Sequence, residues 1–198
     1  MSETIESALL RPDSVEAVQA AVQAALEAEQ PLELLGGGSK RRYGRPLALG
    51  QTLTMEGLQG VLEHQPQELM CIVRAGTRLS ALETALAEKG QELAFEPPHW
   101  SAQATIGGVI ASNLSGPRRF RSGAARDHLL GFQAVTGRGE TIRGGGRVVK
   151  NVTGYDVSKL MCGSFGTLGV MTELCLKVLP KAEFQRTVLA TGLDDAQA

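Results

Sequence analysis

The residues whose types and spacing could do chemistry lie in three glycine-rich stretches. The first reads Gly-Gly-Gly-Ser-Lys from Gly36 to Lys40, and Arg41 and Arg42 follow it. Successive peptide N–H groups in such a run can converge on an anion, and the three basic side chains add positive charge. The stretch therefore predicts phosphate binding, and the alternative is a tight turn with a solvated basic tip.

The spacing of the glycines argues against two common nucleotide-binding motifs. The dinucleotide fingerprint G-x-G-x-x-G would need glycine at position 41, where this chain has Arg41. Gly144 and Gly146 would need glycine at position 149, where this chain has Val149. A Walker A loop needs Gly-Lys followed by Ser or Thr, but Ser39 separates Gly38 from Lys40. Rossmann-type binding and ATP hydrolysis therefore have little support.

The two other stretches combine small residues with hydrogen-bonding side chains. Residues 101–108 contain Thr105 and a Gly-Gly pair, and Asn113 and Ser115 follow them. Such a stretch lets the backbone lie close to a flat or charged ligand, or to another helix. Residues 163–169 carry three glycines before an apolar run, which predicts either a ligand loop or a loop that needs positive φ. The G-x-S-x-G elbow of esterases is absent there.

Composition excludes several classes of protein. Hydrophobic residues make up 42% of the 198, enough for a core, whereas aromatic residues make up 4%, too few for a nucleic-acid stacking platform. The three cysteines lack C-x-x-C spacing and the three histidines form no ligand pair, so we expect no metal site. The sequence shows no apolar run of membrane-spanning length and no signal-peptide layout. These features favour a reduced, cytoplasmic compartment.

Charge is balanced over the whole chain but unevenly distributed. The formal net charge is −1, yet residues 116–150 hold seven arginines and one lysine against two acidic residues. A basic stretch in a neutral protein predicts a local anion site or an acidic partner, and the alternative is a solvated face.

Apolar periodicity predicts alternating helices and strands in the first half of the chain. Residues 13–29 have the pattern of an amphipathic helix capped by Asp13 or Ser14. The other elements expected here are strands over 32–35, 47–53 and 69–74, a helical segment over 57–64, and a helix that starts at Thr77 or Ser80 and ends before Gly90.

The second half is expected to contain more strands and a long loop. The expected elements are a helix over 104–113, a loop over 114–126, a hairpin of strands 129–136 and 140–143, a helical turn over 156–162 and a strand over 170–179. A last strand over 184–191 and a helix cap at 194–195 suggest a truncated protein, and the alternative is a frayed natural tail.

Five motifs in this order resemble the FAD-binding domain of the vanillyl-alcohol oxidase type, also called the PCMH fold. They are G-G-G-S from Gly36, P-P-H-W-S-x-x-A-T-I-G-G from Pro97, S-G-x-x-R-D from Ser122, G-Y-D from Gly154 and G-S-F-G-T-L-G-V-M-T-E from Gly163. Within that family, residues 95–99, 114–119 and 150–161 resemble the FAD-binding subunit of bacterial glycolate oxidase. The resemblance covers residues 13–180.

The resemblance implies an α/β (α+β) fold of two lobes with FAD between them. The lobes would be residues 1–95 and 96–180, and residues 181–198 would begin a C-terminal domain. The first glycine stretch would cradle the pyrophosphate, the second would line the flavin and diphosphate, and the third would hold the adenine end. The cofactor-binding residues so implied are Gly36, Gly37, Gly38, Ser39, Lys40, Pro97, Pro98, Ser101, Thr105, Ile106, Gly107, Gly108, Asn113, Ser115, Ser122, Gly123, Gly169 and Val170.

Two departures from the family pattern matter for the chemistry. Many relatives attach FAD covalently through a histidine in the first glycine loop, but residues 36–45 contain none, so FAD is expected to be non-covalent. Relatives usually also carry a substrate-binding domain after the strand that ends near Leu179, and only about eighteen residues remain here. No catalytic residue is therefore assigned, and His99 is the nearest candidate base in the sequence.

The leading hypothesis is an FAD-dependent oxidoreductase subunit of a glycolate or 2-hydroxy-acid oxidase, inactive alone. Implied partners are a second flavoprotein and an iron–sulfur subunit, with neither nucleic acid nor an integral membrane segment. The expected location is cytoplasmic, with peripheral attachment to the inner membrane through partners. One alternative is a non-catalytic flavin-binding assembly module that docks a catalytic subunit through residues 116–150. A UDP-sugar-linked reductase on the same fold has less support.

Overall fold

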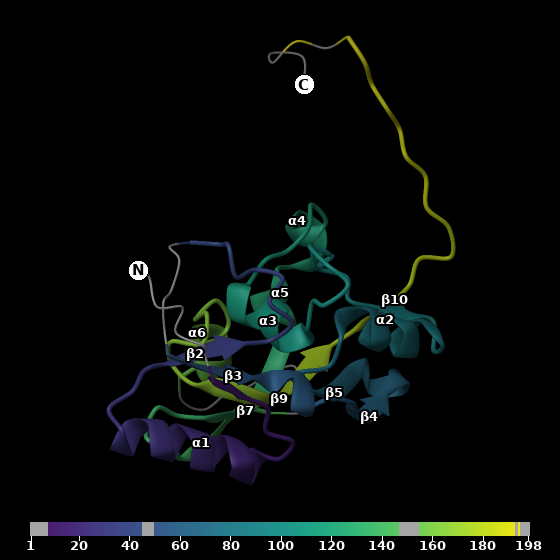
Figure 1. The fold of residues 1–198 in the computed structure, drawn as a ribbon. Helices are drawn as coiled ribbons and strands as arrows, with labels where there is room; N and C mark the ends of the chain where they lie inside the picture. The colour runs from purple at the N-terminus through teal and green to yellow at the C-terminus, as the bar shows by residue number, and fades with distance from the viewer. Residues whose placement is uncertain (1–7, 45–49, 147–154, 193, 195–198) are drawn as a thin grey trace.

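Two β-sheets and the helices packed on them position the glycine-rich stretches in a computed structural model (Figure 1). The structure describes residues 8–44, 50–146, 155–192 and 194. The expected α/β fold is confirmed by this arrangement of mixed helices and strands.

The first sheet is small and parallel. Its strand order is β1 (Ala8–Leu10), β3 (Gln51–Thr54) and β2 (Leu32–Leu35). Helix α1 (Val15–Glu27) connects β1 to β2, and the hydroxyl of Ser14 accepts a hydrogen bond from the Ala17 amide at 3.1 Å. Ser14 is therefore the cap, one of the two predicted.

The second sheet is larger and antiparallel. Its strand order is β4 (Val61–Gln65), β5 (Met70–Arg74), β9 (Val170–Lys177), β7 (Leu129–Val135) and β8 (Thr141–Gly145). The predicted hairpin is confirmed as β7–β8, with Gly139 at φ +76° in its turn. The expected lobe boundary at residue 95 does not coincide with a boundary between the sheets, because β4 and β5 pair into the second sheet.

Short helices cover one side of the larger sheet, and α1 lies on the other side (Figure 1). They are α2 (Leu79–Ala87), α3 (Ile106–Ser112), α4 (Arg119–Ser122), α5 (Ala125–His128) and α6 (Val157–Met161). The main core lies under them and includes the fully buried side chains of Leu82, Phe95, Ile110 and Leu174. A short pair, β6 (Gln91–Glu92) with β10 (Leu179–Pro180), closes the edge near α2.

Several expected elements differ in the structure. The helical segment expected over 57–64 does not form: a 3-10 turn (Met55–Gly57) ends at its first residue and leads into β4, because Gly60 takes φ +114° and the backbone then pairs with β5. The expected loop over 114–126 contains α4 and the start of α5, where the Asp127 carboxylate accepts from the Ala124 amide at 2.9 Å.

The remaining differences concern element ends. Helix α2 begins after Arg78, which makes no side-chain cap, rather than at a Thr77 or Ser80 cap. The expected strand over 184–191 is an extended, exposed segment without strand pairing among the described residues. Part of the expected strand 47–53 and of the cap at 194–195 lies outside the described residues. Within the described ranges, no helix has the length and apolar character needed to cross a bilayer.

Candidate functional site

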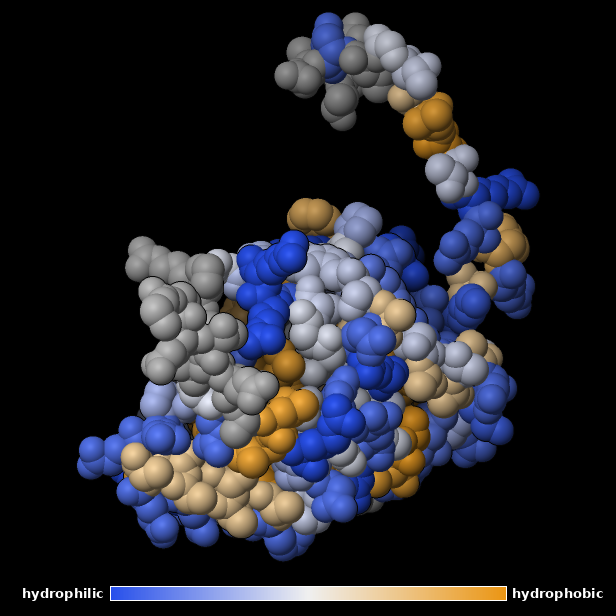
Figure 2. Space-filling view, viewed as in Figure 1, coloured by the Kyte–Doolittle hydropathy of each residue, from blue (hydrophilic) through white to orange (hydrophobic). Residues whose placement is uncertain are grey.

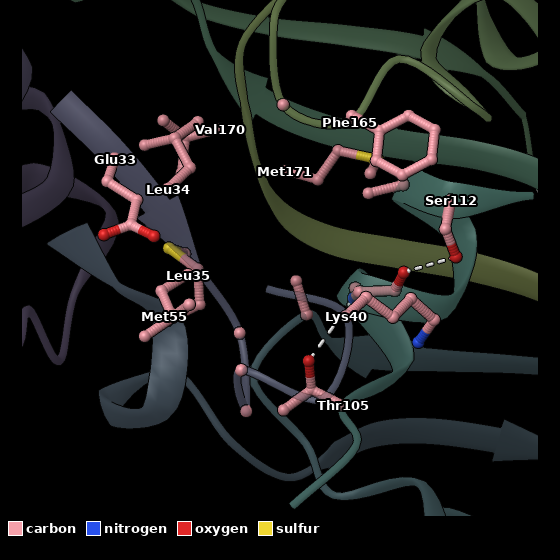
Figure 3. A pocket seen from close by; sticks show the side chains of 18 of the residues that line it. Glu33, Leu34, Leu35, Lys40, Met55, Thr105, Ser112, Phe165, Val170 and Met171 are labelled. Carbon is pink, nitrogen blue, oxygen red and sulfur yellow. Dashed lines mark hydrogen bonds between the residues drawn. The ribbon is translucent and has the colours of Figure 1, made fainter. Parts of the chain in front are cut away.

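A cavity of about 560 Å³ lies between the small sheet and the helices that cover the larger one (Figure 3). Its walls come from β2, residues 36–43, residues 105–112 and residues 165–171. The volume is in the range of small-molecule and cofactor sites. Segments that lie about seventy residues apart in the sequence thus share one cavity, as the three glycine-rich stretches predict.

The glycine loop, defined here as residues 36–40, packs directly on the backbone that precedes α3. A Cβ atom on Gly37 would overlap the carbonyl group of Gln103, and one on Gly36 would overlap the Thr105 hydroxyl. Gly38 has φ +70°, a conformation that favours glycine. Residues 36 and 37 are therefore glycine because of close approach, whereas residue 38 is glycine because of its backbone conformation.

The backbone that meets the glycine loop is held by the side chains of Arg78, which lies outside the cavity wall, and Thr105, which lines it. Arg78 donates through Nη1 to the Gln103 carbonyl at 2.6 Å and through Nη2 to the Glu56 carboxylate at 2.7 Å. The Thr105 hydroxyl accepts from the Gly108 amide at 3.3 Å and caps α3 (Figure 3). This wall of the cavity is consequently formed before any ligand enters.

Lys40 brings a positive charge to the cavity. Its Nζ is buried and has no hydrogen-bond acceptor among the residues that the structure describes. It lies over the Trp100 ring, 5.9 Å from the ring centroid. Burial lowers the pKa of Lys40 from its ordinary value of 10.5, because desolvation disfavours the charged form. An anion in the cavity would satisfy this ammonium group.

An ion pair between the buried Glu33 and the half-exposed Arg41 joins β2 to the residue that follows the glycine loop. Arg41 donates to the two carboxylate oxygens of Glu33, from Nε at 2.8 Å and from Nη2 at 2.6 Å. The Thr52 hydroxyl on β3 donates to the same carboxylate at 3.1 Å. Glu33 is only 7% exposed, and both members of the pair line the cavity.

Aromatic and aliphatic side chains supply the apolar part of the cavity surroundings. Tyr43 stacks on Phe165 with ring centroids 5.8 Å apart, and it contacts Trp100 at 5.9 Å. Leucines of β2 and Met55 form the opposite wall. Figure 2 shows an apolar patch at the position of β2 and β3, with hydrophilic residues above it and to its right. The cavity thus offers an anion cradle beside apolar surface.

Ten of the eighteen expected cofactor-binding residues line the cavity. They are Gly36, Gly37, Gly38, Ser39, Lys40, Thr105, Gly107, Gly108, Gly169 and Val170. The other eight are not part of its wall: Pro97, Pro98, Ser101, Ile106, Asn113, Ser115, Ser122 and Gly123.

Several of those eight residues have structural partners instead. Ile106 is fully buried in the core. The Ser115 hydroxyl accepts from the Ala125 amide at 2.9 Å, and the Asn113 side chain accepts from the Arg126 amide at 3.1 Å. The Ser122 hydroxyl donates to the Ala94 carbonyl at 2.7 Å. The polar side chains stabilise the short helices that the sequence did not reveal, and their contact with a cofactor stays a prediction.

Other cavity residues are not among the eighteen that the resemblance implies, although Arg41 belongs to the expected phosphate site and residues 165–167 to the third glycine-rich stretch. They are Leu32, Glu33, Leu34, Leu35, Arg41, Tyr43, Met55, Ala75, Ala111, Ser112, Phe165, Gly166, Thr167 and Met171. Four of them, Leu35, Arg41, Ser112 and Met171, lie directly beside an expected residue. The position of β2 immediately before the glycine loop was the signal that could have identified its side chains as a wall.

Comparison with known proteins gives consistent matches. A family model described as an FAD binding domain matches residues 7–145. Glycolate oxidase subunit GlcE of Escherichia coli is 46% identical over 85% of this chain and 48% of its own length. Glycolate oxidase subunit GlcD of Bacillus subtilis is 32% identical over 95% of this chain and 40% of its own. D-lactate dehydrogenase of Archaeoglobus fulgidus is 35% identical over 92% of this chain and 40% of its own length.

Solved structures match as well. An alkyldihydroxyacetonephosphate synthase superposes with a TM-score of 0.71 at 26% identity, over 87% of this chain and 31% of that one. The chain spans less than half the length of these relatives.

Proposed function

The chain belongs to the FAD-binding domain family, and from this premise we propose that it is a redox subunit of a glycolate or related 2-hydroxy-acid oxidase. FAD is the cofactor of the family. The observation that carries the proposal is one cavity that Lys40 lines together with Gly36, Gly37 and Gly38.

The residues present fit a dinucleotide with a diphosphate at its centre. Gly36 and Gly37 have no space for side chains, so a ligand meets the loop backbone directly. The Lys40 ammonium is buried without an acceptor among the described residues, which is the environment that a bound anion would complete. The leucines of β2 and the Phe165 ring supply surface for a flat apolar group.

On these features we propose a role for each part of the wall. Backbone amides of the glycine loop and Lys40 would hold the pyrophosphate, while Gly107 and Gly108 let the backbone of α3 approach it. Backbone groups of Gly169 and Val170 would hold the adenine end. When bound, FAD supplies the two-electron redox chemistry, and the protein supplies position and electrostatic surroundings.

The second candidate function is a flavin-binding assembly module whose catalytic groups come from elsewhere. The observation that favours it is the lack of a free base on the described cavity wall. Oxidation of a 2-hydroxy acid needs a base within hydrogen-bond reach of the hydroxyl proton. The carboxylate lining the described cavity belongs to Glu33, which is engaged by Arg41. His99 lies outside the cavity wall, and its Nε2 is 3.0 Å from the Glu83 carboxylate.

The proposal extends to partners. Two relatives carry the word subunit in their names, which supports assembly with other oxidase subunits. We propose that these include a second flavoprotein and an iron–sulfur subunit, and that the complex is cytoplasmic with peripheral attachment to the inner membrane.

We expect FAD to be held without a covalent bond. Neither histidine nor cysteine lines the described cavity, so the nucleophiles most often used for attachment are absent from that wall. Acid precipitation of the flavin-loaded protein should release all the FAD into the supernatant, as measured by its absorbance. Flavin retained in the pellet would contradict the prediction.

We expect the purified 198-residue chain to take up electrons from a chemical reductant but not from substrate. The reason is the lack of a free base on the described cavity wall. The measurement is the flavin absorbance after dithionite and, separately, after glycolate or lactate, with free FAD as control. Turnover well above that of free FAD would contradict the prediction and make His99→Ala the first variant to test.

A further inference from the structure

The ion pair of Glu33 and Arg41 encloses the glycine loop. Glu33 is in the middle of β2, and Arg41 is the first residue after the loop. The pair therefore joins the two ends of a segment whose interior contains Gly36, Gly37 and Gly38. Any change in this pair acts on the whole segment at once.

The carboxylate of Glu33 is held from two sides. It accepts from Arg41 Nε at 2.8 Å and Nη2 at 2.6 Å, and from the Thr52 hydroxyl at 3.1 Å. A bidentate guanidinium–carboxylate pair fixes orientation as well as distance. Since Glu33 is 7% exposed, removal of Arg41 would leave a buried charge without its main partner. The contact is consequently far more directional than an exposed ion pair.

Apart from its packing on residues 103–105 and a hydrogen bond from the Thr54 hydroxyl to the Gly36 carbonyl at 3.5 Å, the glycine loop is held by few contacts. Its local turns are closed by the Arg41 amide to the Gly38 carbonyl at 3.1 Å and by the Tyr43 amide to the Lys40 carbonyl at 2.8 Å. Glycines lose more conformational freedom on ordering than other residues, so a run of three opposes a single conformation. A strong contact across the loop would offset this tendency.

We propose that Glu33 and Arg41 are positioning residues that hold the glycine loop in its ligand-binding conformation before FAD enters. The inference rests on the proposed function for the identity of the ligand, but the order of the empty loop is a property of the protein alone. A loop that is already ordered binds more tightly, because the ligand does not have to order it.

The first test uses the ligand-free protein. Amide hydrogen exchange of residues 36–43 is compared between wild type, Glu33→Gln and Arg41→Gln. Exchange in this segment should be about tenfold faster in both variants, with β5 and β9 unchanged. Arg42→Gln is the matched control, because it removes the same charge from an exposed neighbour, and it should exchange like wild type. Unchanged exchange in both ion-pair variants overturns the proposal.

The second test is FAD affinity, measured by fluorescence titration. Each single variant should bind about tenfold more weakly, and Glu33→Gln with Arg41→Gln should lose no more than either alone, since both remove one contact. Arg41→Lys should recover part of the loss. Additive losses would overturn the proposal, because they would show that each residue acts separately.

If wild type binds no FAD, the proposed function fails, while the exchange comparison still decides whether the ion pair orders the glycine loop. If Glu33→Gln does not fold, the half-exposed Arg41 variants provide the same comparison.

Discussion

Gly37→Val is expected to reduce the affinity for FAD by about 100-fold or more. A Cβ atom at this position would overlap the backbone carbonyl of Gln103, and Arg78 Nη1 would lie within 2.9 Å of it. Because Arg78 also donates to the Gln103 carbonyl, that backbone has little freedom to move away. The glycine loop must therefore leave the wall that it forms with residues 103–105. The measurement is a fluorescence titration with FAD.

A matched control separates this effect from a general loss of glycine. A Cβ atom on Gly137, in the turn between β7 and β8, would have nothing within 4 Å, so Gly137→Ala should bind FAD like wild type. We expect Gly37→Val to lower the free energy of unfolding by about 1–3 kcal/mol, as overpacking does. If Gly37→Val purifies folded and saturated with FAD, the glycine loop does not hold the pyrophosphate.

Lys40→Met is expected to separate FAD affinity from the stability of the empty protein. Loss of a charge-assisted contact to the diphosphate should weaken FAD binding by about 10- to 100-fold. The same change removes a buried ammonium that has no acceptor among the described residues, and methionine fills similar space. The ligand-free variant should therefore be more stable than ligand-free wild type at neutral pH. Urea denaturation and FAD titration measure the two effects.

The pH dependence of this difference follows from the lowered pKa of Lys40. Between that lowered pKa and 10.5, the unfolded chain binds more protons than the folded protein at this residue. Below this window, the charged and desolvated Lys40 lowers the free energy of unfolding. This destabilisation decreases as pH rises through the window, because Lys40 loses its proton in the folded protein. The advantage of Lys40→Met over wild type should shrink accordingly between neutral pH and pH 10. A variant less stable than wild type at neutral pH would contradict the assignment of Lys40 as an unsatisfied cation.

Local sequence patterns predict most of the helices and strands but not their assembly. The cap at Ser14, strand β2 and the β7–β8 hairpin follow from residues within a few positions of one another. Strand β4 was missed, since its conformation depends on pairing with β5 rather than on its own apolar period. The placement of β9 between β5 and β7 depends on contacts across about a hundred residues, which a local pattern does not encode.

The same distinction applies to the candidate site. Glycine clusters predict close backbone approach, and ten expected residues do line the cavity. Side-chain walls were harder to predict, because the side chains of a short strand face the cavity only once its neighbours are known. Glu33 is the clearest case: a glutamate in a strand is typical of a surface, and only the structure shows its buried contact with Arg41.

The central place of β9 has a consequence for synthesis on the ribosome. Its residues, 170–177, pair on one side with β5 and on the other with β7. The β4–β5 pair and the β7–β8 pair therefore join into one sheet only through β9. Until residues 170–177 leave the exit tunnel, β5 and β7 each expose an edge of unpaired backbone N–H and C=O groups, and the cavity lacks the wall that contains Val170 and Met171. The described cavity is therefore complete only after residues 170–171 have been synthesised, and apolar surface that is exposed in the interval favours aggregation.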